Sequence, residues 1–174
     1  MLGAIIGDIV GSRFEFDNHR SKDFELFAEG CFATDDSIMT LSVAKAIMET
    51  QREAADAPAA DAAGLSDATE AEEGVYARLR ANAVYWMRSI GQHYPDCGYG
   101  GRFYWWMFIT DNPAPYDSFG NGAAMRVSPA GFAARSMEEA IALAKAVTEV
   151  THNHPEGIKG AEATAVAVYM ARTG

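Results

Sequence analysis

The chain has 174 residues, of which 49% are hydrophobic, and carries a formal net charge of −10 at pH 7. This length and apolar content suffice for one domain with its own hydrophobic core, which we expect to occupy residues 1–174. The sequence has no basic stripe that would neutralise phosphates and no apolar run near the roughly 18–20 residues that a bilayer requires, which argues against nucleic-acid and membrane partners.

The N-terminal segment reads MLGAIIGDIVGSRFEF and predicts an apolar helix over about 2–11. Gly3, Gly7 and Gly11 recur every fourth residue, so we expect one bare face of this helix to approach other backbone closely. Asp8 is a lone acid in an apolar stretch, a pattern typical of a hydrogen-bonded core residue or a cap.

This segment does not resemble a signal peptide, because no basic residues precede it and Asp8 interrupts its apolar stretch. The two cysteines, Cys31 and Cys97, are interpreted as free thiols in a reducing cytosol rather than as a disulfide. We therefore expect the protein to be cytoplasmic.

Residues 34–37 read Thr-Asp-Asp-Ser and lie where a loop turns into a predicted helix over about 35–52. Thr34 is a good N-cap, and Asp35 and Asp36 fall in the first turn, where the helix dipole favours negative charge. Two adjacent carboxylates flanked by hydroxyls are also a compact group of hard oxygen donors suited to Mg²⁺ or Mn²⁺. The residues alone leave capping and metal binding both open.

An acidic, alanine-rich segment follows at about 52–74. It has no apolar periodicity, so we expect a flexible surface insertion there. The next predicted helix, over about 76–93, has a regular apolar face and ends near Gly91 and Pro95.

The linker from Tyr94 to Ala134 is long and rich in glycine and aromatic residues, and loops of this length are usually functional. One part of it, 103–109, also fits a short core helix. Near its end, Ser-Phe-Gly-Asn-Gly at 118–122 precedes what we interpret as a helix start at 123–126. Small residues let backbone N–H groups approach a ligand, and a helix N-terminus attracts anions, although most such turns bind nothing.

The last two predicted helices begin at Ser136, which opens a capping box, and at about Glu156. Between them, the pair His152 and His154 suggests zinc, but the neighbouring donors are hard oxygens, so we reject that interpretation. Pro155 indicates a helix start that Asn153 or His154 caps. No segment shows useful strand-like alternation, so the sequence predicts an all-α fold.

Four motifs occur in order along the chain: GDIVGSRFE at 7–15, TDDSIM at 34–39, YDSFGNGAAMRVSP at 116–129 and THNHPEGIKGA at 151–161. On these motifs the chain resembles the ADP-ribosylglycohydrolase family, which includes the dinitrogen-reductase-activating glycohydrolases and the ADP-ribosyl-acceptor hydrolases. The resemblance implies an all-α, orthogonal multi-helix fold. It also implies a metal-dependent hydrolase that cleaves the glycosidic bond between ADP-ribose and an acceptor.

The resemblance also assigns roles to individual residues. It implies that Thr34, Asp35 and Asp36 bind metal (Mg²⁺ or Mn²⁺, with two ions in a complete family site), and that Glu15, Asp35 and Asp36 are catalytic. Asp8 is expected to support the metal ligands by hydrogen bonding. The residues expected to bind substrate are Ser118, Gly120, Asn121, Gly122, Met125, Arg126 and His154. From its type alone, Arg126 fits either a phosphate contact or a structural ion pair, and His152 is the weaker candidate of the two histidines.

The chain departs from the family pattern in one respect. Family members continue further and carry a second metal motif, Asp-x-Asp-Thr, which is missing from this sequence. We therefore expect a fold without its C-terminal helices, whose exposed apolar faces self-association or a complementing chain would cover. The expected partner is an ADP-ribosylated protein or small molecule. The alternatives are a non-catalytic ADP-ribose- or nucleotide-binding domain and a structural remnant of the same fold.

Overall fold

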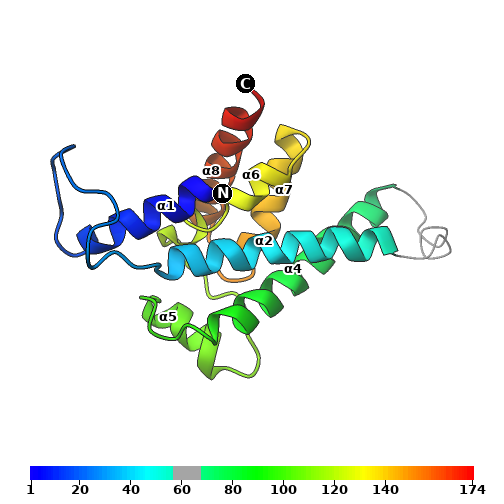
Figure 1. The fold of residues 1–174 in the computed structure, drawn as a ribbon. Helices are drawn as coiled ribbons and strands as arrows, with labels where there is room; N and C mark the ends of the chain where they lie inside the picture. Colours follow the sequence, from blue (N-terminus) through cyan, green and yellow to red (C-terminus); the bar gives the residue numbers. More distant parts are fainter. Residues whose placement is uncertain (57–67) are drawn as a thin grey trace.

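The computed structural model of the protein describes residues 1–56 and 68–174, and all regular secondary structure in these ranges is helical. The all-α prediction is confirmed. Two long helices, α2 (Asp35–Asp56) and α4 (Ala68–Gly91), run in roughly opposite directions and share the most extensive helix–helix interface. Figure 1 shows them as the central frame to which the other helices attach.

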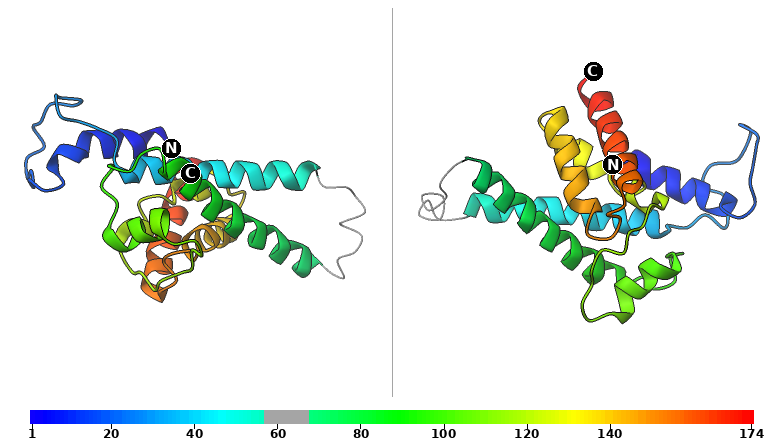
Figure 2. Two further views of the ribbon diagram at one scale, coloured as in Figure 1. Left: turned by 90° about the horizontal axis from the view of Figure 1, so that it is seen from below. Right: turned by 180° about the vertical axis from the view of Figure 1, so that it is seen from behind.

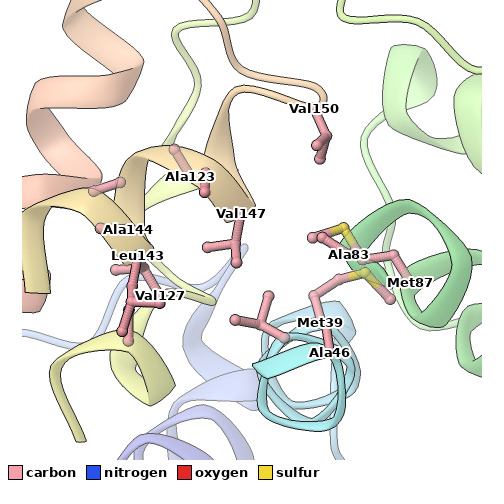
Figure 3. Packing of buried hydrophobic residues seen from close by; sticks show 14 of the residues in the cluster. Met39, Ala46, Ala83, Met87, Ala123, Val127, Leu143, Ala144, Val147 and Val150 are labelled. Atoms are coloured by element: carbon pink, nitrogen blue, oxygen red, sulfur yellow. The ribbon is translucent and has the colours of Figure 1, made fainter. Parts of the chain in front are cut away.

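The α2–α4 interface is the centre of the hydrophobic core. Met39 and Ala46 of α2 face Ala83 and Met87 of α4, and all four side chains are fully buried (Figure 3). α4 ends at Gly91, where an added Cβ would lie 2.7 Å from Met107 Sδ. Any larger residue at position 91 would have to displace the Met107 side chain, so the residue that terminates α4 also leaves room for the following segment to pack against the core.

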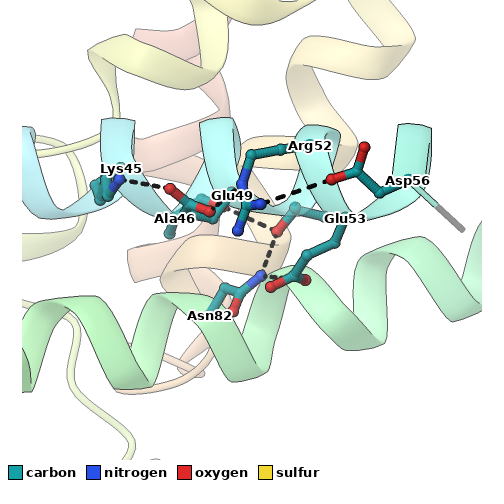
Figure 4. Close-up of polar contacts among 8 residues, drawn as sticks. Lys45, Ala46, Glu49, Arg52, Glu53, Asp56 and Asn82 are labelled. Atoms are coloured by element: carbon teal, nitrogen blue, oxygen red, sulfur yellow. Dashed lines mark hydrogen bonds and ion pairs between the residues drawn. The ribbon is translucent and has the colours of Figure 1, made fainter.

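Both long helices extend further than the sequence pattern predicts. Alanine and glutamate have high helix propensity, so both ends of the expected insertion at 52–74 are helical, while residues 57–67 lie outside the described residues. The extension of α2 is held to α4 by Asn82, whose side-chain amide donates to Thr50 Oγ1 at 2.9 Å and to Glu53 at 3.1 Å (Figure 4).

The linker after α4 is more helical than expected. It forms α5 (Gly101–Tyr104), a π-helical turn η2 (Trp105–Ile109) and α6 (Ser128–Ala133). The predicted short core helix at 103–109 is confirmed, because Phe103 and Trp106 are buried and their rings stack with centroids 5.5 Å apart. α6 was not predicted.

The C-terminal helices α7 (Met137–Thr148) and α8 (Pro155–Thr173) pack together over α6. The predicted cap of α7 is half confirmed: Ser136 Oγ accepts from the Glu139 N–H at 3.1 Å. Glu139 does not return the bond to the Ser136 N–H, because its carboxylate instead accepts from the Arg135 N–H and pairs with the Arg135 guanidinium.

The first helix, α1 (Leu2–Gly11), lies against the start of α2 and continues into a 3-10 turn, η1 (Ser12–Phe14). The expectation of close backbone packing on its glycine face is wrong for the described residues. A Cβ added at Gly3, Gly7 or Gly11 would meet no atom within 4 Å, and Leu2 and Ile6 are exposed. No described element covers this face of α1.

The tightest backbone packing instead joins α6 and α8, which yields a stability prediction. A Cβ at Gly131 would lie 2.8 Å from Val168 Cβ and 3.0 Å from Tyr169 N, so Gly131→Ala is expected to lower the free energy of unfolding by about 1–3 kcal/mol. Gly160→Ala is the matched control, since its Cβ meets nothing within 4 Å; helix propensity should raise the free energy of unfolding by up to about 1 kcal/mol. Urea denaturation measures both, and equal stabilities would contradict the packing.

Candidate active site

The carboxylate of Asp8 holds the start of α2. Its Oδ2 accepts from the backbone N–H of Thr34 at 2.9 Å and of Ser37 at 3.2 Å. The two hydroxyl groups donate to the same carboxylate, Thr34 to Oδ1 and Ser37 to Oδ2, each at 2.5 Å. A side chain of α1 therefore satisfies backbone donors at the N-terminus of α2.

Thr34 occupies the N-cap position, as predicted. Its Oγ1 accepts from the Asp36 N–H at 3.3 Å, and its carbonyl accepts from the Ile38 N–H at 3.2 Å. Asp35 and Asp36 lie in the first helical turn, also as predicted. Because capping is performed by Thr34 and Asp8, the carboxylates of Asp35 and Asp36 are not needed for it.

The pKa values of Asp35 and Asp36 are raised by burial and by neighbouring acids. Burial and then the neighbouring Asp36 raise the pKa of Asp35 to about 6, with smaller contributions in the same direction from Glu15 and Asp8. Burial, Asp8 and Glu15 likewise raise the pKa of Asp36. Glu15, remote in sequence from α2, is thus brought to the same cluster. Half-buried like charges of this kind are the electrostatic pattern of a cation site.

The donor chemistry fits a hard divalent cation, since every group is a carboxylate or hydroxyl oxygen. The geometry is less complete. Within residues 1–56 and 68–174, no three His, Cys, Asp or Glu side chains converge to a point where they could hold a metal ion. The metal ligands expected from the sequence, Thr34, Asp35 and Asp36, therefore stay a prediction.

The turn after α4 forms one wall of this cluster, which the sequence analysis missed. The Asp35 N–H donates to the Cys97 carbonyl at 2.7 Å. Gly98 follows with a φ of +92°, a conformation that favours glycine, and a Cβ there would lie 3.7 Å from Asp35 Oδ1. Cys97 and Cys31 are both free thiols, as expected.

The glycine turn, residues 118–122, packs on the start of α8. A Cβ at Gly157 would lie 2.9 Å from the Ser118 carbonyl oxygen, and a Cβ at Gly122 would lie 3.1 Å from His152 Nε2. The expected helix start at 123–126 is wrong: the turn leads into a single 3-10 turn, η3 (Asn121–Ala123). The next helix begins only at Ser128, where Pro129 presets the helical backbone.

The two histidines lie in different environments beside the glycine turn. His154 caps α8, its Nδ1 accepting from the Glu156 N–H at 3.1 Å, and its ring lies 5.3 Å from that of Phe119. His152 is only 4% exposed and lies directly under the glycine turn. Burial and then the nearby Arg126 lower the pKa of His152 to about 3, so its ring is neutral at physiological pH.

Arg126 is buried rather than displayed at the surface. Its side chain is 0% exposed, its Nη2 donates to Thr151 Oγ1 at 2.6 Å, and its guanidinium carbon lies 5.4 Å from the centre of the Phe103 ring. No acidic side chain is paired with it among the described residues. The structural ion pair considered from its sequence position is therefore absent from this part of the chain.

The acidic cluster and the glycine turn are neighbours. Thr40, one helical turn after Asp36 on the same face of α2, donates to the Met125 carbonyl at 3.3 Å. All views in Figures 1 and 2 show the yellow-green segment around residue 120 beside the first turns of α2. The structure thus brings together Asp8, Glu15, the start of α2, the glycine turn and His152 from distant parts of the sequence.

A known protein family matches this sequence along its length. The family model described as ADP-ribosylglycohydrolase matches residues 1–174. The chain belongs to the ADP-ribosylglycohydrolase family. No curated protein matches the chain.

Membership in the ADP-ribosylglycohydrolase family confirms the resemblance inferred from the four motifs, and the family is one of hydrolases. The all-helical architecture agrees with it. None of the helices in residues 1–56 and 68–174 combines the length and apolar character needed to cross a membrane.

The raised pKa of Asp35 yields a pH prediction for this family member. Ionising Asp35 costs more in the folded chain than in the unfolded chain, so the contribution of Asp35 to the free energy of unfolding should fall as pH rises from about 4 to about 6. Asp35→Asn removes this loss and should be more stable than the wild type at pH 7 by about 1–2 kcal/mol, less than the full shift because solvent screens the charge. Urea denaturation in EDTA at pH 4 and 7 measures it.

The matched control is Asp111→Asn, at an exposed site away from the cluster. It should leave the difference between pH 4 and pH 7 unchanged. An Asp35→Asn variant with the same pH dependence as the wild type would contradict the electrostatic account.

Proposed function

We propose that the chain acts in the metal-dependent hydrolysis of the glycosidic bond that joins ADP-ribose to an acceptor. The observation that carries the proposal is the cluster of Asp8, Glu15, Asp35 and Asp36 beside a glycine turn that rests on a buried neutral histidine. The acids suit a cation and a sugar diol, and the turn suits a diphosphate. ADP-ribose contains both in one molecule.

The carboxylates would hold Mg²⁺ or Mn²⁺ at the start of α2. Asp35 and Asp36 are the ligands, with Thr34 adjacent, and Asp8 fixes all three through the hydrogen bonds to the helix start. A divalent ion there would neutralise the crowded acids and polarise the ribose hydroxyls or a water molecule. A complete family site would hold two ions, and one is the most that this acid pair supports.

Glycosidic cleavage passes through an oxocarbenium-like transition state with positive charge on the sugar. Carboxylate groups near the anomeric carbon would stabilise that state. Glu15 ends η1, is exposed, and interacts electrostatically with both acids, so it is placed to accept a proton from the attacking water. The substrate would be an ADP-ribosylated protein or an ADP-ribosylated small molecule.

The glycine turn would receive the diphosphate. Gly120, Gly122 and the exposed Asn121 leave backbone within reach of a ligand, and Ser118 Oγ supports the turn by accepting from the Gly120 N–H at 3.3 Å. Met125 and His154 border the turn. Arg126, being buried, would act on the diphosphate through its charge rather than by direct contact.

Titration calorimetry with Mg²⁺ tests the cation site. Asp35→Asn/Asp36→Asn keeps the shape of both side chains but removes their charges, and should weaken Mg²⁺ binding by at least about tenfold. Asp111→Asn is the control and should bind like the wild type. Indistinguishable isotherms for the wild type and the double variant would remove the metal from the proposal.

A second candidate function, ADP-ribose binding without turnover, is favoured by the lack of a three-carboxylate metal group among the described residues. Release of ADP-ribose from an ADP-ribosylated protein, measured with Mg²⁺ present, separates the two. Turnover that is lost in Asp35→Asn/Asp36→Asn supports the hydrolase, and binding without turnover supports the second candidate.

The glycine turn gives a separate prediction. A methyl group at Gly122 would press on the His152 ring, 3.1 Å from Nε2, whereas one at Gly120 would lie in ordinary contact, 3.5 Å from Ser118 Oγ. Gly122→Ala should therefore weaken ADP-ribose binding by about tenfold, and Gly120→Ala should have the smaller effect. Fluorescence or calorimetric titration measures both, and the reverse order would contradict the proposed ligand position.

A further inference from the structure

A continuous chain of buried polar groups runs beneath the glycine turn. Arg126 Nη2 lies 2.6 Å from Thr151 Oγ1, which lies 2.8 Å from His152 Nδ1. The arginine and threonine side chains are 0% exposed and the histidine is 4% exposed. The links join the end of the glycine-turn motif to the loop before α8.

The donors and acceptors in this chain can be assigned from chemistry. Arginine only donates, so Thr151 Oγ1 accepts from Arg126 and keeps its own hydroxyl proton to donate. That proton has two acceptors within reach, His152 Nδ1 at 2.8 Å and the Thr148 carbonyl at 3.4 Å. The shorter contact has normal hydrogen-bond length and the longer one is marginal, which favours donation from the hydroxyl to His152.

The direction of this bond fixes the histidine. The ring is neutral, because burial and the charge of Arg126 lower the pKa of His152 to about 3. A neutral imidazole carries one ring proton, and Nδ1 is occupied as an acceptor, so the proton is on Nε2. Nε2 lies 3.1 Å from the Cβ position of Gly122 and 3.8 Å from that of Gly120. No group in the described residues accepts a hydrogen bond from it.

We propose that Arg126 and Thr151 form a relay that fixes His152 as its Nε2–H tautomer and thereby directs a neutral hydrogen-bond donor at the glycine turn, where the proposed function puts the ligand. Both are positioning residues, acting through His152. The ligand class that such a donor suits is one rich in acceptors, a phosphate or diphosphate ester. The ligand class rests on the proposed function, whereas the tautomer of His152 does not.

Buried Arg126 sets the direction of the hydrogen bonds in the relay, because it can only donate. Its Nε and Nη1 have no hydrogen-bond partner among the described residues, and its guanidinium lies over the Phe103 ring, so Thr151 is the hydrogen-bond acceptor that positions the cation. An arginine cannot reverse its role and accept. A serine at position 151 can replace the hydroxyl, whereas a valine of similar shape cannot, so the two substitutions separate hydrogen bonding from packing.

The test is a long-range ¹H–¹⁵N spectrum of the histidine rings, with the His152 signals identified by their loss in His152→Gln. The wild type should show an unprotonated Nδ1 and a protonated Nε2, unchanged between about pH 5 and pH 8. Thr151→Ser should retain this pattern. Thr151→Val should lose it, giving a mixture of tautomers.

Either of two spectra would overturn the relay: a protonated Nδ1 in the wild type, or an unchanged Nε2–H tautomer in Thr151→Val. The wild-type spectrum decides the first point even when Thr151→Val fails to fold. Arg126→Lys provides the second variant: it keeps a cation but shortens its reach, and should shift His152 away from the single Nε2–H form. If His152 keeps the single Nε2–H tautomer in Arg126→Lys, Arg126 has no role in the relay.

Titration with ADP-ribose connects the relay to the ligand. Thr151→Ser should bind like the wild type, and Thr151→Val about tenfold more weakly, as expected for a lost hydrogen bond to a charged acceptor. Equal affinities in the two variants, with the tautomer changed, would overturn the link to the ligand. A wild-type chain that binds no ADP-ribose would overturn the proposed function, and the ring spectrum would still decide the relay.

Discussion

The carboxylate of Asp8 is the group on which the candidate site depends. It accepts hydrogen bonds from two backbone N–H groups and two hydroxyls, those of Thr34 and Ser37, and so joins α1 to the first turn of α2. Bonds to an ionised acceptor are stronger than those between neutral groups, and this one also lies at the positive end of a helix dipole. Because capping is complete without them, Asp35 and Asp36 keep their carboxylates free for another purpose.

The site keeps the acids Asp35 and Asp36 apart from the cation Arg126, and within residues 1–56 and 68–174 each of these groups loses hydration without gaining an opposite charge in contact with it. Burial raises the pKa of Asp35 and Asp36 on one side and lowers the pKa of Arg126 to about 10 on the other. Among the described residues, no direct ion pair offsets the loss of water at any of the three. A fold that only needed stability would pair these groups or replace them with apolar side chains. The arrangement instead matches a ligand that brings a cation to the acids and an anion to the glycine turn.

The packing of the helices holds the acidic cluster and the glycine turn next to each other. The α2–α4 interface is the most extensive contact between helices in the described residues, and α2 meets the segment after the glycine turn through Thr40 and the Met125 carbonyl. On the other side, the start of α8 packs on the glycine turn, because a Cβ at Gly157 would lie 2.9 Å from the Ser118 carbonyl oxygen and 3.4 Å from His152 Cβ. His152 therefore lies between the start of α8 and the glycine turn.

Local sequence determined the helical class, the N-caps Thr34 and Ser136 and the helix at 103–109, since each depends on residues within a few positions of one another. The order of the four motifs along the chain determined the family. Tertiary structure alone decided the rest of the site. It placed His152 rather than His154 beneath the glycine turn, buried Arg126, set Cys97 against Asp35 and left the glycine face of α1 uncovered. These outcomes depend on contacts between segments far apart in the chain, and burial, which sets the protonation state of each group, exists only once those segments have packed.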